Sequence, residues 1–548
     1  MTPSLRLAAA LVAAFGLVVG VVPLLGGPPA GDDAYFHAIR AQQHARCWLL
    51  GEAWPRWYPD LNEGIGGPEP RAYPLWPLLA QGALALVLGD GIAATSVATA
   101  VIPVVAGLVM LVVARRRGAA TGPSVVLAAA WAATPYLVIA VHERSALAEG
   151  WGLAILPWVL DSLLPPSPVG GRGIARAAVA FAVLLAVQLP LALMVVVLVA
   201  GGHLAARRGK AAQGASWAGL LGLGLGALSW LPNVVSLRRL SGEALVAGAY
   251  GWREHLLPSG VAADAVLGLN LSLALAGMVA AGGVLAVAGG RASRCLAGGA
   301  LASALLTTPL AGWVHGVVPG LGLLQFPWRW LGPASALVVL AAAASERRRI
   351  RALALALLTF PVVAAGPWRW RLPAGPALDP HDPLPVSAQA VRRYGLPPVL
   401  LSLPGYVPRG TNLVEAMADA RRLAAVVGDG AVAGPPEWRF TVESAVTRWQ
   451  EFPLLADAGW RVRLDGRPVR WHERAGLVAV ALPAGRHEVF FRQRVLPEDL
   501  VGAMSSALAL ALLFVLRRGS SGVGRWRRAT TQPRRTRISQ DSPVRGVP

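Results

Sequence analysis

Residues 92–117 read IAATSVATAVIPVVAGLVMLVVARRR, an apolar run that ends on three arginines. A helix needs roughly 20 apolar residues to cross the hydrocarbon core of a bilayer. Arginine is concentrated at the cytoplasmic ends of such helices. The stretch therefore predicts a transmembrane helix whose C-terminal end lies in the cytoplasm.

Similar apolar runs recur along the 548-residue chain. The composition is 55% hydrophobic and only 14% charged, whereas soluble domains carry roughly 25% charged residues. This balance argues against both a soluble enzyme and a disordered chain. The net charge of +21 would indicate nucleic acid in a soluble protein, but here the arginines cluster at the ends of apolar runs. We therefore expect no nucleic-acid partner.

The arginine clusters predict about twelve spans, with both termini in the cytoplasm. We interpret residues 5–26 as a retained helix rather than a signal peptide, because the run is long and no good cleavage site follows it. Residues 74–89 are short for a span, so we expect a half-inserted helix on the outer face. The expected spans are 5–26, 92–114, 122–141, 146–164, two within 177–206 that break near Gln188-Leu189-Pro190, 215–232, 265–289, 296–311, 330–345, 352–366 and 498–516.

Between the last two spans lies a segment of a different kind. After proline-rich linkers it contains alternating, strand-like stretches such as WRFTVESAV and HEVFFRQR, with turn residues at Asp465-Gly466 and Ala484-Gly485. We predict a small extracytoplasmic antiparallel β domain. The expected modules are a transmembrane module over 1–366 with a first outer loop at 27–91, the β domain over 367–497, the last helix at 498–516, and a basic, disordered cytoplasmic tail at 517–548.

The first outer loop carries the residues best suited to chemistry. It contains GDDAYFHAIRAQQHARCWLLGEAWPRWYPDLNEGIGGPEPRAYPLWPLL over residues 31–79. Asp32 and Asp33 directly follow the first span, and on a helix Asp33, His37 and Arg40 share one face. A carboxylate at a membrane boundary must be solvated, paired or turned toward a cavity. Two interpretations fit: a solvated loop that begins with acids, or a site with a base and a cation.

Aromatic residues follow in the same loop. Trp54, Trp57 and Tyr73 fit the belt of aromatic side chains found at membrane surfaces. Their flat apolar rings equally suit stacking on a sugar. The sequence leaves both interpretations open.

The order of motifs in this loop resembles a known family. Asp-x-x-x-His-x-x-Arg, then Pro-Arg-Trp-x-Pro-Asp-Leu-Asn-x-Gly-x-Gly-x-Pro, then Tyr-Pro-Leu, is similar to bacterial multipass glycosyltransferases of the GT-C fold and to YfhO-like proteins. Four later stretches also resemble this family and keep its order. They are ERSALAEGWGLAILPWVL (143–160), SWLPNVVSL (229–237), LLQFPWRWLGPASAL (323–337) and FPLLADAGWRVRLDGRPV (452–469).

The resemblance implies inverting glycosyl transfer on the outer face, from a polyprenyl-phosphate sugar. It implies that an aspartate of the first loop acts as catalytic base. Asp33 matches that position relative to His37, and Asp32 is the neighbour that can substitute for it. The chain departs from the family pattern at Glu69-Pro70-Arg71, where apolar and aromatic residues are commoner, and at Gln188-Leu189-Pro190.

A departing phosphate calls for fixed cations, and the planar fork of arginine binds two oxygens at once. The outer-side candidates for binding the donor phosphate are Arg144, Arg329 and Arg40, with snorkelling interfacial arginines as the alternative. Glu143 and Glu149 flank the start of the same span as Arg144 and are expected, with His37, to support the site. No ligand spacing indicates a metal, so we assign no cofactor and no metal residue, although the resemblance leaves a divalent metal open.

The sequence thus predicts an α-helical polytopic membrane protein of GT-C-like fold in the bacterial cytoplasmic membrane. Its expected partners are the lipid bilayer, a polyprenyl-phosphate-linked sugar, and an extracytoplasmic glycan or protein acceptor. The alternative is a non-catalytic handler of lipid-linked glycans, such as a flippase or an assembly factor of the cell envelope. Such a protein would use the same cavity without a base.

Overall fold

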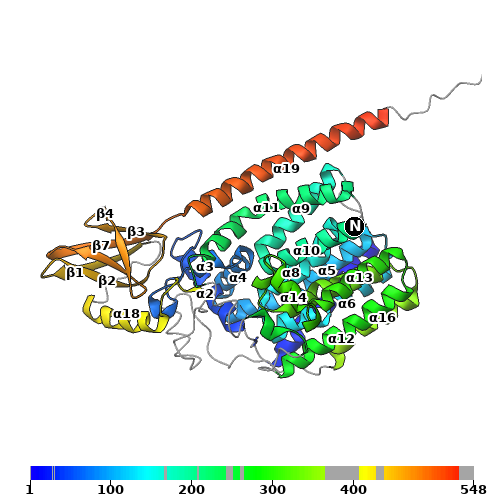
Figure 1. Cartoon of the computed structure of the whole chain (residues 1–548), viewed down its shortest axis with the longest axis horizontal. Coiled ribbons are helices and arrows are strands. Elements are labelled where there is room, and N and C mark those ends of the chain that lie inside the picture. The colour runs from blue at the N-terminus through cyan, green and yellow to red at the C-terminus, as the bar shows by residue number, and fades with distance from the viewer. Residues whose placement is uncertain are drawn as a thin grey trace, which may run out of the picture.

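The structure, a computed structural model, divides into a large helical bundle and a small β domain (Figure 1). The N-terminus and the β domain lie toward opposite ends of the long axis. The described residues are all except 1, 27–28, 30, 32, 166–169, 207–208, 242–250, 259–264, 365–405, 428–436 and 530–548.

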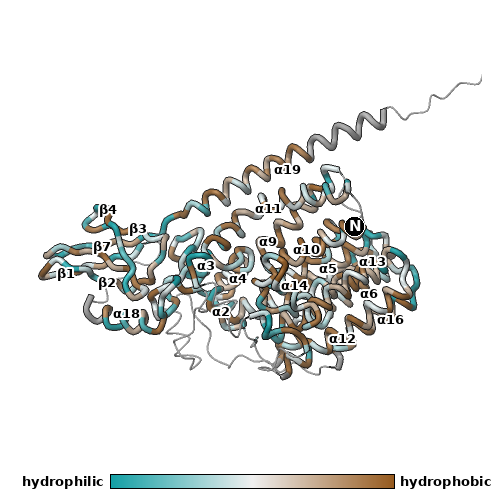
Figure 2. Tube along the Cα trace, in the orientation of Figure 1, coloured by the Kyte–Doolittle hydropathy of each residue, from teal (hydrophilic) through white to brown (hydrophobic). Residues whose placement is uncertain are grey.

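Hydrophobic residues dominate the helices of the bundle (Figure 2). These helices are α1 (Pro3–Val21), α5 (Gly91–Arg116), α6 (Thr121–Ala132), α7 (Pro135–Val138), α8 (Leu147–Leu163), α9 (Gly171–Val187), α10 (Leu189–Ala206), α11 (Gly209–Leu237), α12 (Ala265–Ala288), α13 (Arg291–Leu305), α14 (Gly312–Val317), α15 (Leu331–Ala343), α16 (Arg348–Ala364) and α19 (Pro497–Ala529). Helix α15 is buried at every position from Leu331 to Ala342, so it forms the centre of the bundle.

Among the described residues, six helices are long and apolar enough to cross a membrane: α1, α5, α10, α11, α12 and α19. Two bent pairs, α6 with the segment 135–143 and α13 with the segment 309–317, raise the number to eight if each pair is one span. The remaining predicted ranges coincide with α8, α9, α15 and α16, which have 13 to 17 residues. The chain is therefore built as a multi-pass membrane protein, while the number of about twelve spans stays a prediction.

The predicted break within 177–206 falls at Gln188. This residue is extended, with φ −158° and ψ 103°, between the end of α9 and the start of α10. Pro190 lies in the first turn of α10, where the missing N–H removes no helical hydrogen bond. The fixed φ of Pro190 and its missing N–H thus explain why α10 starts at Leu189.

The first outer loop folds into three helices, α2 (Ala34–Leu49), α3 (Glu69–Ala72) and α4 (Leu75–Leu88). Helix α4 is the apolar helix expected at 74–89, and it ends on Gly89, whose φ of 69° is left-handed. It lies against α2, since a Cβ on Gly82 would come within 2.8 Å of the His44 ring. Its depth in the membrane stays a prediction.

The β domain contains two antiparallel sheets, confirming the predicted small antiparallel domain. One sheet has the order β1-β7-β3-β4 and the other β2-β6-β5. The predicted turn at Asp465-Gly466 joins β3 to β4, with φ of 49° and 81°. The strands are β1 (Glu437–Ser444), β2 (Arg448–Leu455), β3 (Trp460–Leu464), β4 (Arg467–Val469), β5 (Trp471–Arg474), β6 (Leu477–Leu482) and β7 (Gly485–Gln493).

Several boundaries differ from the sequence-based expectation. Helix α18 (Leu413–Val427) was not predicted, and the expected linkers at 367–405 lie outside the described residues. Trp57 and Ile65 of the first outer loop belong to the hydrophobic core of the β domain, so that domain is not made from 367–497 alone. Helix α19 continues to Ala529, so the predicted disordered tail begins as helix, and its remainder lies outside the described residues.

Candidate functional site

The site lies where the first outer loop meets the segments before α8 and α15. The start of α2 supplies Asp33, His37 and Arg40. A π-helical turn, Ile139–Glu143, leads to Arg144, and α8 begins just after it and carries Glu149. Arg329 comes from the 3-10 turn Pro327–Trp330 in front of α15.

Backbone hydrogen bonds fix Asp33 beside Arg144. The Asp33 N–H donates to the Arg144 carbonyl oxygen at 3.0 Å, and the Gly31 N–H donates to Ser145 Oγ at 3.2 Å. Gly31 fits so closely that a Cβ there would stand 2.3 Å from the Glu143 carbonyl oxygen. Ser145 takes a left-handed φ of 52°, a strained backbone for a residue with a side chain. The loop before α2 and the turn before α8 are thus built as one unit.

Glu149 joins two of the predicted phosphate-binding arginines. Its Oε2 accepts from Arg144 Nη1 at 2.9 Å and from Arg329 Nε at 3.2 Å. The Tyr136 hydroxyl donates to the other oxygen, Oε1, at 2.5 Å. Both guanidinium groups also lie near the Phe326 ring, at 5.2 Å for Arg144 and 4.9 Å for Arg329. One carboxylate shared by two cations leaves a net positive charge beside Asp33.

The third cation, Arg40, sits in a cage of its own. Its Nε donates to Glu69 Oε2 at 2.9 Å, and both side chains are almost completely buried. The rings of Tyr73 and Tyr406 lie 4.3 Å and 5.5 Å from the guanidinium carbon. Arg40 Nη2 is buried without a hydrogen-bond partner among the described residues. An N–H left in this state is available to a bound anion.

The electrostatics set Asp33 apart from the other acids. In the part of the chain that the structure describes, its carboxylate forms no hydrogen bond and no ion pair. Burial raises its pKa above the ordinary value, and the charges of Arg144, Arg40 and Arg329 oppose that rise. A carboxylate without a partner, with a raised pKa and in reach of three cations, is suited to accept a proton.

His37 is uncharged at neutral pH and has a structural role. Burial, reinforced by Arg40, lowers its pKa to about 3, so its ring is neutral. Its Nε2 accepts the Leu147 N–H of α8 at 3.3 Å, and its ring lies edge-on to Tyr73 at 5.9 Å. His37 therefore ties α2 to the start of α8, and its expected supporting role at the site stays a prediction.

The structure gathers most of the predicted site residues and separates a few. Gathered together are Asp33, Arg40, Arg144, Arg329, Glu149, His37 and Tyr73. Asp32 lies outside the described residues. Glu143 is buried and accepts a hydrogen bond from Asn270 of α12, so it is engaged with that neighbouring helix.

The expectation of sugar stacking is wrong for Trp57. Its side chain is 0% exposed, because it packs edge-on against Trp460 of the β domain at 4.9 Å and is covered by Gly66. Trp54 is 38% exposed and lies near the Arg56 guanidinium group, at 5.3 Å. Its ring remains accessible, so stacking at Trp54 stays a prediction.

Three residues of the site were missed from the sequence. Tyr136 follows Thr134-Pro135 at a helix start, and Tyr406 lies in a stretch without a motif, so neither carried a signal that pointed to the arginines. Glu69 was noted only as a departure from the family pattern, yet it is the counterion of Arg40. The available signal was the charge of Glu69 itself, at a position where the family has an apolar or aromatic residue. An acid in such a place needs a cation as its partner.

The sequence leaves a divalent metal at this site open. Among the described residues, no group of three or more His, Cys, Asp or Glu side chains is placed to hold one. Glu149, the acid nearest the arginines, already neutralises two of them and is a poor metal ligand for that reason.

Comparisons with solved structures show likenesses to an arabinofuranosyltransferase. The chain is similar to the mycobacterial arabinofuranosyltransferase AftD, with a TM-score of 0.43 and 20% identity, over 66% of this chain and 27% of that chain. A mutant of AftD gives a TM-score of 0.42 and 23% identity over the same shares. The chain thus spans 27% of the length of the proteins it resembles. No protein-family model matches the sequence, and no curated protein does.

Proposed function

We propose that this chain is a membrane glycosyltransferase of the GT-C type. It transfers a sugar from a polyprenyl-phosphate donor to an extracytoplasmic glycan or protein, with inversion. The observation that carries the proposal is the Asp33 carboxylate, which pairs with none of the described residues and lies within reach of Arg40, Arg144 and Arg329. A structural ion-pair network would have neutralised that carboxylate with one of the arginines.

The reaction divides between the acid and the cations. Asp33 takes the proton of the acceptor hydroxyl, whose oxygen attacks the anomeric carbon of the donor. The bond from that carbon to the phosphate oxygen breaks, and polyprenyl phosphate leaves with the electron pair. Arg144, Arg329 and Arg40 bind the phosphate and stabilise the charge that develops on it. A single displacement of this kind inverts the anomeric centre, because no enzyme nucleophile takes part.

The orientation follows from charge. Arginine clusters such as Arg115-Arg116-Arg117 at the end of α5 belong on the cytoplasmic side. Both termini then lie in the cytoplasm, and the site and the β domain face the outside of the bacterial cytoplasmic membrane. The donor's lipid tail stays in the bilayer while its phosphate reaches the arginines. Reporter fusions within residues 31–71 should report an extracytoplasmic location, and a cytoplasmic location would overturn the orientation.

Proteoliposomes that contain the full chain and a polyprenyl-phosphate sugar test the chemistry. Asp33→Asn should lower the transfer rate by about 10²–10⁴-fold, the usual contribution of a general base. Asp90→Asn is the matched control, because the Asp90 side chain accepts the Ile92 and Ala93 N–H groups at the start of α5, and asparagine caps equally well. Transfer at the wild-type rate by Asp33→Asn would exclude the base. Binding of the donor without consumption, in the wild-type protein and with every acceptor tried, would favour the lipid-linked glycan handler.

A further inference from the structure

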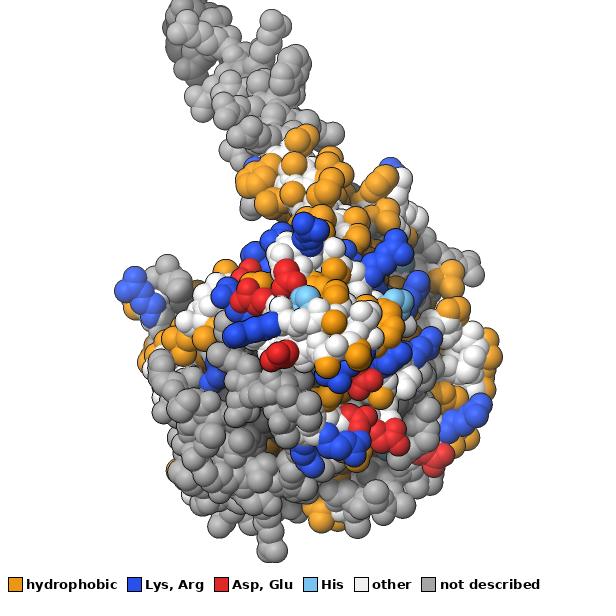
Figure 3. All heavy atoms as spheres, turned by 90° about the vertical axis from the view of Figure 1, so that its left-hand side faces the viewer, with side chains coloured by type: hydrophobic (Ala, Val, Ile, Leu, Met, Phe, Trp, Pro, Cys, Tyr) orange, Lys and Arg blue, Asp and Glu red, His pale blue; other side chains and the backbone are white. Residues whose placement is uncertain are grey.

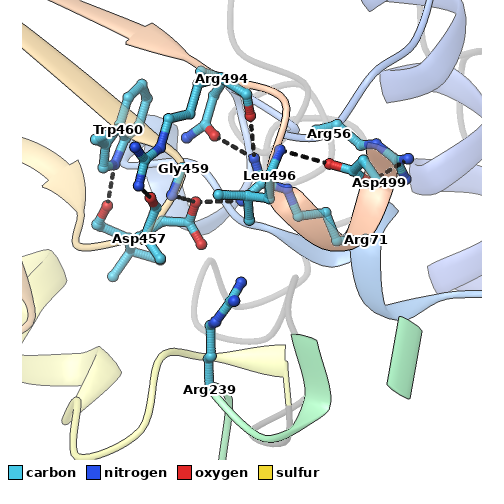
Figure 4. Close-up of polar contacts among 12 residues, drawn as sticks. Arg56, Arg71, Arg239, Asp457, Gly459, Trp460, Arg494, Leu496 and Asp499 are labelled. Atoms are coloured by element: carbon cyan, nitrogen blue, oxygen red, sulfur yellow. Dashed lines mark hydrogen bonds and ion pairs between the residues drawn. The ribbon is translucent and has the colours of Figure 1, made fainter. Parts of the chain in front are cut away.

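Helix α3 touches the site with one residue and the β domain with another. Glu69 at its start pairs with Arg40, at 2.9 Å, and Tyr73 directly after its end stacks on the same guanidinium group. Arg71, two residues after Glu69, reaches into the β domain and donates to Asp457 (Figure 4). The helix is only four residues long, so a displacement of Arg71 is passed directly to Glu69 and Tyr73.

The β domain holds Arg71 in a closed socket (Figure 4). Arg71 Nη1 donates to Asp457 Oδ1 at 2.5 Å, and Nη2 donates to Gln493 Oε1 at 2.7 Å and to the Arg494 carbonyl oxygen at 3.4 Å. The side chain of Arg71 is 2% exposed. Asp457 is itself fixed, because the same Oδ1 accepts the Gly459 N–H at 2.7 Å. A buried guanidinium group with this many partners is held in one orientation.

Gly459 shows how tightly the socket closes. A Cβ at this position would stand 2.1 Å from Gln493 Oε1 and 2.4 Å from Arg71 Nη2. The Trp460 side chain, next in the chain, packs against Trp57 of the outer loop. The turn between β2 and β3 therefore packs directly against Arg71 and has no room for a side chain at position 459.

Two further contacts hold the same loop to the C-terminal part of the chain, and a third holds that part to the segment after α11. Arg56 Nη2 pairs with Asp499 at the start of α19, at 2.5 Å. The Leu455 N–H donates to the Ile65 carbonyl oxygen at 2.9 Å, at the point where the register of β2 shifts. Arg239, at the end of α11, pairs with Glu498. The β domain therefore cannot tilt without moving the loop residues that precede α3.

We propose that Arg71 is a positioning residue, through which the seating of the β domain on α3 sets the place of Arg40 at the donor-phosphate site. The inference rests on the proposed function, because it assigns Arg40 to the phosphate. Glu69 and Tyr73 hold Arg40 from two sides, and Arg71 holds the helix that carries them. The proposal gives the departure from the family pattern at Glu69-Pro70-Arg71 a function in this chain. Glu69 contacts Arg40 of the site, and Arg71 contacts Asp457 of the β domain.

Binding of polyprenyl phosphate, the product without its sugar, tests the inference without requiring turnover. In the full chain, Arg71→Gln and Asp457→Asn should each weaken this binding about tenfold. The double variant should bind no more weakly than Arg71→Gln alone, because Asp457→Asn removes a contact that Arg71→Gln has already removed. Arg71→Lys should recover part of the affinity, since lysine can reach Asp457 but cannot also hold Gln493 and Arg494. Arg492→Gln is the control, as it breaks an exposed ion pair to Glu437 in the same domain.

Hydrogen exchange gives a second measurement that needs no ligand. Arg71→Gln should speed amide exchange in residues 34–49 and 69–73, and Arg492→Gln should not. If exchange rises only inside the β domain while polyprenyl phosphate binds as tightly as to the wild type, the inference is overturned. If the wild-type protein binds no polyprenyl phosphate but exchange in 34–49 still responds to Arg71→Gln, the proposed donor is wrong and the coupling through α3 stands.

Discussion

The backbone N–H of Asp33 donates to the carbonyl oxygen of Arg144 at 3.0 Å, so the acid and the cation of the site are joined by the main chain. Their side chains are then free to act on a third group rather than on each other. Arg144 has its own counterion in Glu149, which leaves the Asp33 carboxylate without an ion pair in the described part of the chain. This division of the charges is the basis of the predictions on activity.

The acid limb of the pH profile should belong to Asp33. Its pKa is raised by burial, and a base works only when it is deprotonated, so kcat/KM should fall as the pH drops through a value above the usual aspartate range. Arg40→Gln removes a positive charge that lowers this pKa, and the midpoint of the limb should therefore move to higher pH. Transfer rates measured from pH 4 to 8 in proteoliposomes check both points.

Arg492→Gln in the β domain is the control for the pH profile, because its exposed pair with Glu437 lies outside the site. Its midpoint should equal that of the wild type. A midpoint that moves to lower pH in Arg40→Gln would contradict the assignment, whatever happens to the absolute rate. The position of the midpoint is informative even though Arg40 also contributes to binding.

Glu149→Gln should destabilise the protein. The substitution leaves Arg144 and Arg329 buried without their shared counterion, and breaking a buried ion pair costs about 3–5 kcal/mol. Thermal unfolding of the detergent-solubilised chain should therefore show a clearly lower Tm. Glu437→Gln removes a carboxylate from an exposed pair and should leave the Tm within error. Equal Tm values for the two variants would mean that Glu149 does not neutralise the arginines.

The sequence predicted the helices well because long apolar runs bounded by arginine carry their own signal. The break at Gln188 and the turn at Asp465-Gly466 also follow from local signals, because Pro190 and Gly466 restrict or free the backbone at their own positions. The spacing of Asp33, His37 and Arg40 is also a local property: Asp33 is the N-cap residue of α2, and His37 and Arg40 lie in its first two turns.

What the sequence did not reveal depends on contacts between distant segments. Trp57 has an aromatic ring typical of a membrane interface, and nothing near it in the chain shows that Trp460 covers it. Tyr406 approaches Arg40 only because residues 407–409 pair with residues 239–241 at the end of α11. Arg71 appeared as a departure from a family pattern, because its partner Asp457 belongs to another domain.

Gly31→Ala should damage the site through sterics alone. A Cβ at Gly31 would meet the Glu143 carbonyl oxygen at 2.3 Å, and neither backbone can withdraw without moving Asp33 or Arg144. Overpacking of this kind costs about 1–3 kcal/mol. We expect a lower Tm together with a reduced transfer rate, both measured on the purified full chain.

Gly219→Ala is the matched control, since Gly219 lies within α11 and a Cβ there would meet nothing within 4 Å. Alanine favours a helix over glycine by about 1 kcal/mol, so this variant should be as stable as the wild type or slightly more stable. If Gly31→Ala behaves like Gly219→Ala, the loop before α2 is not held against the turn before α8 as described.

His37 should make stability depend on pH below neutrality. Its pKa is about 3 in the folded protein, because burial and Arg40 disfavour the charged ring, and near 6.5 in the unfolded chain. The unfolded chain therefore binds a proton below pH 6.5 that the folded protein does not bind, and stability falls as the pH falls. Between pH 7 and 5.5 the loss from this one group is roughly 1 kcal/mol.

His37→Gln removes the titration and keeps an acceptor for the Leu147 N–H. The variant should lose less stability than the wild type between pH 7 and 5.5, measured as the change in Tm of the full chain in detergent. His44, whose pKa burial lowers to about 4, contributes a slope of the same sign in both proteins and so cancels from the comparison. A variant with the same pH dependence as the wild type would show that His37 takes up its proton in the folded state, and α2 would then not be tied to α8 by a neutral ring.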